Sequence, residues 1–326
     1  MAPAEPAGER ARWARRAAGT ASPERLIQVL LGVVWLVDGA LQLQPSMFGR
    51  GFVTGMLMPT AAGNPAPVAS SITAMARFLE PHIAAWNALF AATQLAIGLG
   101  LLVRKTVRPA LVTSFVWSLL VWWFAEGLGG LLTGTASPLS GAPGAVLLYI
   151  FVGLLAWPSG GENRGLGGTT RPGALGERGA RAAWALVWVG SAALLLQPAN
   201  LTRGALRATL VAAEAGQPGW YAWVLSSAAR VLGPDGVVLT AALAAEMALV
   251  GVGVAAGWRT QSLLGVAFVL ALVIWVFPEG LGGILTGTGT DPNTGPLLLL
   301  VAFAWHRLTS QPRTSDPRTV RVFAPA

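Results

Sequence analysis

Two acidic residues lie inside long apolar stretches of the chain. Asp38 falls within residues 26–44, and Glu246 falls within residues 236–256. At the depth of a membrane helix an ionisable side chain is costly, and by default it indicates a functional site. Such a carboxyl group could hydrogen-bond a quinone carbonyl or relay a proton. The alternative is a structural role, in which both acids join Gln94 and other polar side chains in holding helices together.

A twelve-residue segment occurs twice, and each copy contains one glutamate. Residues 124–135 read FAEGLGGLLTGT, residues 277–288 read FPEGLGGILTGT, and ten of the twelve positions are identical. An internal repeat of this kind indicates one structural unit made twice. Its glycines permit tight turns and close packing of helices. The segment lacks the strand–turn–helix setting of a nucleotide-binding loop, so Glu126 and Glu279 are its candidate site residues.

Other polar residues recur at the same separation as this repeated segment. Each lies 153 positions from its counterpart, and the pairs are Gln44/Gln197, Arg50/Arg203 and Arg77/Arg230. A guanidinium can hold a carboxylate through two hydrogen bonds, so we expect these arginines to pair with Glu126 and Glu279. Either the pairs only fix the outer segments to the rest of the protein, or they form a site with the glutamines. That site would take an anion, a lipid headgroup or another polar ligand.

Several cofactor classes are not expected from the composition. The chain has no Cys and only two His, His82 and His306. Disulfides, thiolate metal sites and bis-histidine haem are therefore not predicted, and neither is any other metal site. The net charge of +8 does not indicate nucleic-acid binding, because the basic residues stand beside apolar stretches.

The composition as a whole is typical of a polytopic membrane protein. Of the 326 residues, 54% are hydrophobic and only 11% are charged, whereas a soluble domain has about 25% charged residues. Apolar runs of roughly 20 residues can cross a bilayer as helices. The eight candidate spans are 26–44, 83–103, 109–125, 143–157, 183–197, 236–256, 263–278 and 295–308.

The number of spans and the positions of the basic residues predict the topology. With four spans in each copy, both copies enter the membrane from the same side. We therefore predict an all-α polytopic bundle of eight transmembrane helices, arranged as two parallel four-helix repeats. If the N-terminus is cytoplasmic, only five of the 22 basic residues lie outside. The positive-inside rule then favours a multi-pass protein of the inner or plasma membrane with both termini in the cytoplasm.

These spans divide the chain into five segments. We predict a cytoplasmic Arg-rich tail, a first four-helix membrane repeat, a cytoplasmic linker, a second four-helix membrane repeat and a cytoplasmic tail. Their ranges are 1–25, 26–157, 158–182, 183–308 and 309–326. The lipid bilayer is the expected partner of both repeats.

The second and third spans carry a resemblance to a known family. Residues 94–104 read QLAIGLGLLVR and are followed by Arg-Pro-Ala at 108–110, while residues 246–259 and 31–39 have related patterns. In this order of polar mid-helix residue, glycines and basic turn, the chain resembles the DoxX/DoxD-like membrane family. The resemblance implies a four-helix membrane unit. Some members are subunits of thiosulfate:quinone oxidoreductases, so it also implies that a quinone could be bound.

Three functions are compatible with this pattern. The leading interpretation is a DoxX-like protein with an outward-facing polar site, acting as a quinone- or lipid-associated subunit of a membrane redox or envelope system. The second is a small-molecule, anion or lipid transporter that uses the intramembrane carboxylates. The third is a non-catalytic scaffold whose outer segments bind a membrane or extracytoplasmic protein. No catalytic motif is visible, and no cofactor other than a quinone is indicated.

Overall fold

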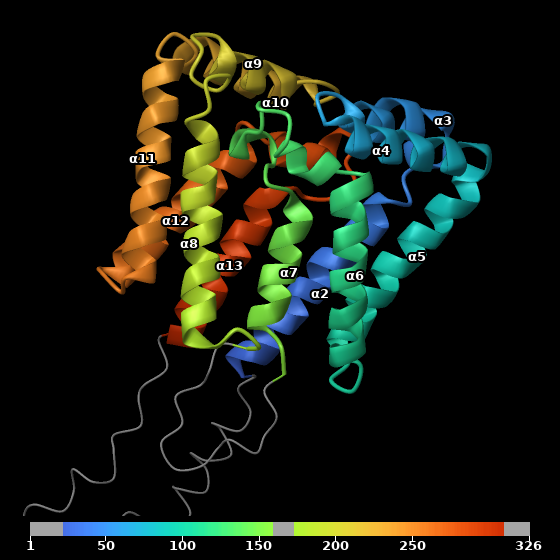
Figure 1. Ribbon diagram of the computed structural model, residues 1–326, viewed down its shortest axis with the longest axis horizontal. Helices are drawn as coiled ribbons and strands as arrows, with labels where there is room; N and C mark the ends of the chain where they lie inside the picture. The colour runs from blue at the N-terminus through green and yellow to red at the C-terminus, as the bar shows by residue number, and fades with distance from the viewer. Residues whose placement is uncertain (1–21, 159–172, 310–326) are drawn as a thin grey trace, which may run out of the picture.

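The structure is a computed structural model that describes residues 22–158 and 173–309, and these residues are all-helical (Figure 1). No β-strand occurs in either range, which confirms the predicted all-α class for the described residues. A long helix coincides with each predicted span. These helices are α2 (Pro23–Leu41), α5 (Ile83–Leu102), α6 (Val107–Phe124), α7 (Ala145–Leu155), α8 (Gly176–Leu195), α11 (Gly236–Ala255), α12 (Thr260–Val276) and α13 (Thr294–Thr309).

Four helical segments of the described residues are long and apolar enough to cross a membrane by length and composition. They are Ala66–Leu102, Val107–Phe124, Gly236–Ala255 and Thr260–Thr286. The first joins α4 (Ala66–Leu79) to α5, and the last continues from α12 into η8 (Gly280–Thr286). Much of their surface is apolar and exposed, for example at Leu119 and Val269. A bilayer is the environment that suits such a surface.

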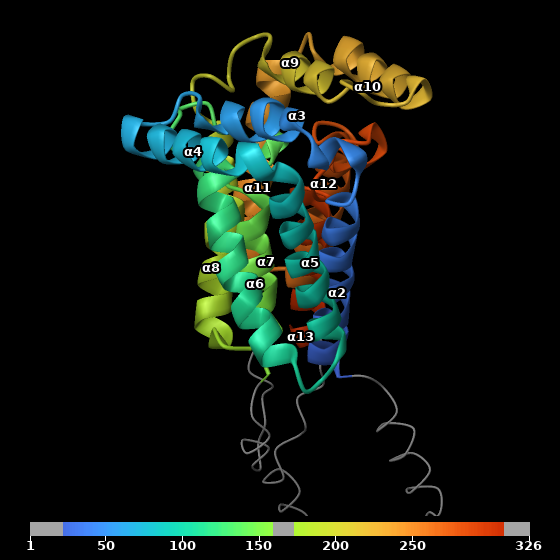
Figure 2. The same cartoon turned by 90° about the vertical axis from the view of Figure 1, so that its right-hand side faces the viewer.

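The long helices lie side by side, and shorter helices lie across one end of the bundle (Figure 2). The crossing helices are α3 (Arg50–Phe52), α4, α9 (Ala205–Ala212) and α10 (Gly219–Leu232). We call this end the capped end. The described chain begins and ends at the opposite end, where the α5–α6 and α11–α12 turns also lie (Figure 1). We call that end the terminal end.

The core lies along the line where the two halves of the chain meet. Helix α2 packs against α5, α8 packs against α11, and α7 packs against α13 between them. The largest fully buried side chains include Trp35, Tyr149, Trp184 and Trp188. Burying each of these aromatic side chains removes roughly 150–250 Å² from solvent. They hold together the helices that carry the site.

The ends of some helices differ from the predicted spans. Helix α8 begins at Gly176, seven residues before the predicted start at 183, because its first turn is polar and carries the pair Arg181 Nη2–Glu177 Oε1 at 2.7 Å. Helix α2 begins at Pro23, where the Ser22 hydroxyl accepts a hydrogen bond from the Arg25 N–H. Most of the predicted tails and linker, at 1–21, 159–172 and 310–326, lies outside the described residues.

Candidate functional site

Each copy of the repeated segment forms the same tight turn at the capped end. In the first copy residues 127–130 all have positive φ, between 55° and 68°, and residues 280–283 of the second copy lie between 55° and 67°. A Cβ on Gly129 would lie 2.0 Å from the Pro143 carbonyl oxygen, and one on Gly282 would lie 2.5 Å from the Pro292 carbonyl carbon. Glycine is needed at both positions for backbone conformation and for space. The repeated glycines are therefore accounted for by the fold.

The two repeated glutamates point at the N-termini of the helices that follow them. Glu279 Oε2 accepts a hydrogen bond from the Gly295 N–H at 2.9 Å, and Glu279 Oε1 accepts one from the Thr294 hydroxyl. Glu126 Oε1 accepts a longer bond from the Val146 N–H, at 3.4 Å. A carboxylate suits this place, because a helix N-terminus offers free N–H groups and partial positive charge.

The two glutamates differ in what remains unsatisfied. Both oxygens of Glu279 are bonded, and its exposed fraction is 7%. Glu126 Oε2 is buried and has no hydrogen-bond partner. An unsatisfied buried acceptor is costly, so a ligand that donates to it would be stabilised. Glu279 therefore holds the start of α13, whereas Glu126 has one buried oxygen that lacks a hydrogen bond.

We expect Glu279→Ala to destabilise the protein more than Glu126→Ala does. The first change removes two hydrogen bonds and leaves the donors at the start of α13 without an acceptor. We expect it to lower the free energy of unfolding by about 2–3 kcal/mol. The second removes one long bond, and we expect a loss of about 1 kcal/mol or less. Thermal unfolding of both variants in the same detergent would measure the difference. Equal losses in the free energy of unfolding would contradict the difference between the two carboxyl groups and show that they stabilise the fold equally.

The predicted pairing of these glutamates with outer arginines is wrong. Arg50 Nε instead lies 3.1 Å from Glu80 Oε1, and Arg230 donates to the Ser227 hydroxyl at 2.8 Å. All four predicted arginines are exposed, namely Arg50, Arg77, Arg203 and Arg230. The reason is geometric, since the crossing helices keep their arginines on the surface while the glutamates turn inward to helix N-termini.

Contacts near Gln44 join the two halves of the chain at the capped end. Gln44 Nε2 donates to the Gly289 carbonyl at 3.0 Å, and the Ser46 hydroxyl donates to the Gly287 carbonyl at 2.7 Å. In the other direction, Asn200 Nδ2 donates to the Ala136 carbonyl at 2.8 Å. The two acceptors at 136 and 289 are related by the repeat. Each half therefore holds the loop of the other.

Gln197, the counterpart of Gln44, makes no such contact. Its Oε1 is buried without a hydrogen-bond partner, and Asn200 makes the bond to the opposite half instead. The sequence predicted a role for Gln197 from the repeat alone. It gave no signal for Asn200, because the residue at the matching position of the first copy is Met47.

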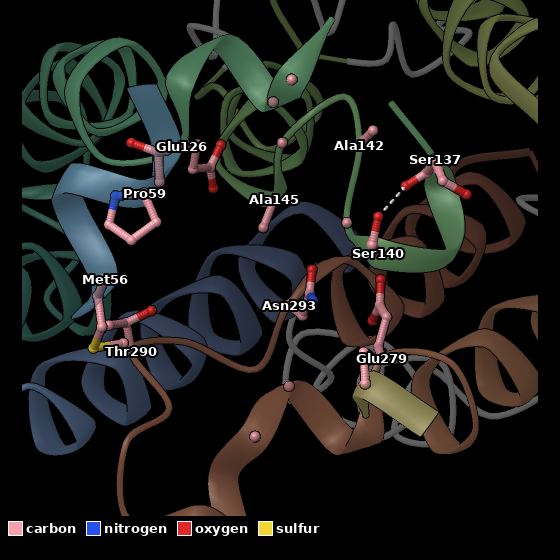
Figure 3. A pocket seen from close by; sticks show the side chains of 18 of the residues that line it. Met56, Pro59, Glu126, Ser137, Ser140, Ala142, Ala145, Glu279, Thr290 and Asn293 are labelled. Carbon is pink, nitrogen blue, oxygen red and sulfur yellow. Dashed lines mark hydrogen bonds between the residues drawn. The ribbon is translucent and has the colours of Figure 1, made fainter. Parts of the chain in front are cut away.

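The two repeated turns meet around a cavity of about 640 Å³, which we call the central cavity. Figure 3 shows Glu126 and Glu279 on different sides of it, with Asn293 between them. Asp291 and the threonines of both repeated segments also line it. Among the described residues, its lining contains no Arg or Lys. The central cavity is therefore rich in acceptor oxygens and lacks a matching positive charge.

The environment of the central cavity changes how its carboxyl groups titrate. Burial, followed by the nearby negative charge of Asp291, raises the pKa of Glu126 to about 8. Burial also raises the pKa of Asp291, although its own loop donates to it from the Asn293 N–H at 2.7 Å. The Asp-Pro-Asn loop is thus a turn in which the aspartate accepts a hydrogen bond from its own backbone, and Asp291 also lines the central cavity.

A second cavity of about 460 Å³ adjoins the first, and we call it the side pocket. Met56, Glu126, Thr290 and Asp291 line both. The rest of the side pocket lies within the first half and is largely aromatic. Its rings are those of Trp35, Phe52, Phe78, Trp86, Phe90, Trp117, Phe124 and Tyr149.

Two of the three predicted intramembrane polar residues line the side pocket. Asp38 is 3% exposed and accepts a hydrogen bond from the Tyr149 hydroxyl at Oδ2, and Gln94 is 8% exposed. Glu246, in contrast, is exposed on the outer face of α11 and lines neither cavity. Met247 occupies the buried position beside it. The structure therefore brings Asp38 and Gln94 together and leaves Glu246 apart.

Comparisons with protein-family models, curated proteins and solved structures gave no match. The site is therefore described by its own geometry. Within residues 22–158 and 173–309, no group of three or more His, Cys, Asp or Glu side chains could hold a metal ion.

Proposed function

We propose that this chain is an integral membrane protein of two parallel four-helix units, and that it binds a small organic cation from the outer side. The central cavity is the binding site. The observation that carries the proposal is that both repeated turns meet at one cavity with three carboxyl groups. No Arg or Lys of the described residues lines it.

The membrane topology is supported by the way the long helices alternate. The long helices run between the capped end and the terminal end (Figure 2), and four helical segments of the described residues are long and apolar enough to cross a membrane. Basic residues of the described α5–α6 and α11–α12 turns, Arg104, Lys105, Arg108 and Arg259, lie at the terminal end. We propose that this end is cytoplasmic, in agreement with the positive-inside rule. The central cavity then opens on the outer side.

The free groups of the cavities support a cationic ligand. Glu126 Oε2, Asn64 Oδ1 and Gln217 Oε1 line the central cavity as buried acceptors without partners. A ligand that carries several N–H donors and a positive charge would satisfy such acceptors. An anion or phosphate headgroup would instead face carboxyl groups, which would repel it.

A quinone-linked function remains the alternative that follows from the DoxX-like resemblance. The aromatic side pocket has a suitable shape for a flat ring, and Trp117 Nε1 is a buried donor there without a partner. Asp38 Oδ1 and Glu126 Oε2, the free carboxyl oxygens of the same pocket, are acceptors. A quinone carbonyl requires donors, which these carboxyl groups provide only when protonated, whereas their ionised form favours the cation.

Binding of guanidinium to the full chain in lipid nanodiscs would test the proposal, with urea as the neutral molecule of the same shape. We expect guanidinium to bind at least about tenfold more tightly than urea, and Glu126→Gln to remove at least about tenfold of that affinity. Glu246→Gln is the matched control, because it removes a carboxyl group that lines neither cavity. Equal binding of guanidinium and urea would overturn the proposal.

A further inference from the structure

We infer that the natural ligand is an amphipathic amine whose aromatic or aliphatic body occupies the side pocket. Its positively charged nitrogen would lie among Asp38, Glu126 and Asp291, which all line that pocket. The inference rests on the proposed function and deepens it, because Glu126 and Asp291 belong to both cavities. The proposed function names only a small organic cation, and the inference specifies that this cation has a large apolar part.

The first step concerns the charged end of the side pocket. Asp38 is almost fully buried, its Oδ2 is bonded to the Tyr149 hydroxyl, and its Oδ1 has no partner. Glu126 Oε2 is in the same situation. Both atoms belong to carboxyl groups. Rotating an Asn or Gln amide by 180° would exchange its oxygen for a nitrogen, but rotating a carboxyl group leaves an oxygen in the same place. Two residues that line one cavity thus each have a buried oxygen without a hydrogen bond, and a donor group on the ligand would supply what these oxygens lack.

The second step concerns the apolar wall of the side pocket. Phe78, Trp86, Phe90 and Trp117 follow one another with ring centroids 5.4, 6.5 and 5.4 Å apart. Such a row of rings offers apolar contact to a flat or chain-like body. Aromatic faces also attract a cation held close to them. The combination of rings and carboxyl groups therefore suits an amine with an apolar body.

The third step comes from comparing the two halves of the chain. The features needed for folding recur, as the turns of the repeated segments show. Among the side-pocket residues, Trp35, Phe124 and Glu126 recur as Trp188, Phe277 and Glu279, but several others do not. At the matching positions 153 residues later, Asp38, Trp86, Phe90 and Trp117 are replaced by Ser191, Leu239, Leu243 and Leu270.

Nor does the second half replace the tyrosine. No Tyr occurs in α13, the counterpart of the helix that carries Tyr149. The second half instead contributes Thr290 and Asp291 to the pocket of the first half. The side pocket is therefore specialised within the first half and is completed by residues of the second half.

The test compares 4-phenylbutylamine with 4-phenylbutan-1-ol, its neutral analogue, on the full chain in nanodiscs. We expect the amine to bind at least about tenfold more tightly than the alcohol, and Asp38→Asn to abolish this preference. Trp117→Leu should lower the affinity for both the amine and the alcohol about fivefold or more, and it should leave the affinity for guanidinium unchanged. Ser191→Ala, at the position that matches Asp38 in the second half, should change nothing.

Equal affinity for the amine and the alcohol would overturn the inference, as would a preference that survives Asp38→Asn. Should Asp38→Asn fail to fold, Trp117→Leu decides, since leucine occupies the matching position of the second half. One outcome separates the inference from the proposed function. If Glu126→Gln weakens guanidinium binding but Trp117→Leu leaves 4-phenylbutylamine binding unchanged, the inference fails and the proposed function stands. If neither molecule depends on Glu126, both fail.

Discussion

Replacing Gly129 by alanine is expected to prevent the chain from reaching its folded state. The new Cβ would lie 2.0 Å from the Pro143 carbonyl oxygen, and the backbone φ at this position is +62°. Neither the clash nor the conformation can be relieved without moving the segment that leads into α7. We expect a loss of more than about 3 kcal/mol in the free energy of unfolding, seen as aggregation or as a greatly lowered Tm in detergent.

Two other glycines provide graded controls for this substitution. Gly134 has a φ of +74° but no heavy atom within 4 Å of an added Cβ, so Gly134→Ala should cost only about 1–2 kcal/mol. Gly51 has neither constraint, and Gly51→Ala should be nearly neutral. If Gly129→Ala were as stable as Gly51→Ala, the turn of the repeated segment would not have the geometry described.

The second large effect is a rise in guanidinium affinity with pH. The pKa of Glu126 is raised to about 8, so this carboxyl group is neutral at pH 6 and charged at pH 9. Guanidinium keeps its charge throughout this range, as the arginine side chain does. Because only the charged carboxylate attracts the cation, affinity should rise about tenfold per unit below pH 8 and level off above it. Between pH 6 and 9 we expect an increase of about 100-fold.

Glu126→Gln should make this pH profile shallower, because the group that titrates near pH 8 is then absent and only Glu279, whose pKa burial raises to about 7, still titrates in the same cavity within this range. Glu246→Gln should leave the profile unchanged, since Glu246 lines neither cavity. The measurement is the guanidinium dissociation constant at several pH values, with wild type and both variants in the same nanodiscs. An affinity that falls as pH rises, or a slope as steep in Glu126→Gln as in the wild type, would contradict the assignment.

The sequence predicts the helices of this protein well, because long apolar runs leave few alternatives to a helix. It also predicts that the repeated segment contains candidate site residues, Glu126 and Glu279. It did not predict the partners of the glutamates. From the sequence alone, an Arg and a Glu that are expected near the same end of a bundle are plausible partners. The structure shows that Glu279 is bonded at the start of α13, whereas Arg50 pairs with Glu80.

The exposed position of Glu246 has a simple geometric cause. The repeat aligns Gln94 with Met247, and matching Gln94 to Glu246 requires a shift of one residue. On an α-helix one residue corresponds to a rotation of about 100°, which moves a side chain from a buried face to an exposed one. Met247 is 1% exposed, whereas Glu246 lies on the outer surface. The sequence does not place Asp291 in the side pocket of the first half, because its position there depends on long-range packing.

The central claim is that one cavity on the outer side, between the two repeated turns, binds the cation. The chain has no Cys, so a single cysteine at Thr288, an exposed residue of the cavity lining, would be the sole target of a thiol reagent. We expect Thr288→Cys to react with a membrane-impermeant maleimide in intact cells, and guanidinium to slow the reaction. Ala256→Cys, at the terminal end, should react only after permeabilisation. Labelling of Thr288→Cys that requires permeabilisation, or that saturating guanidinium leaves unchanged, would contradict the account.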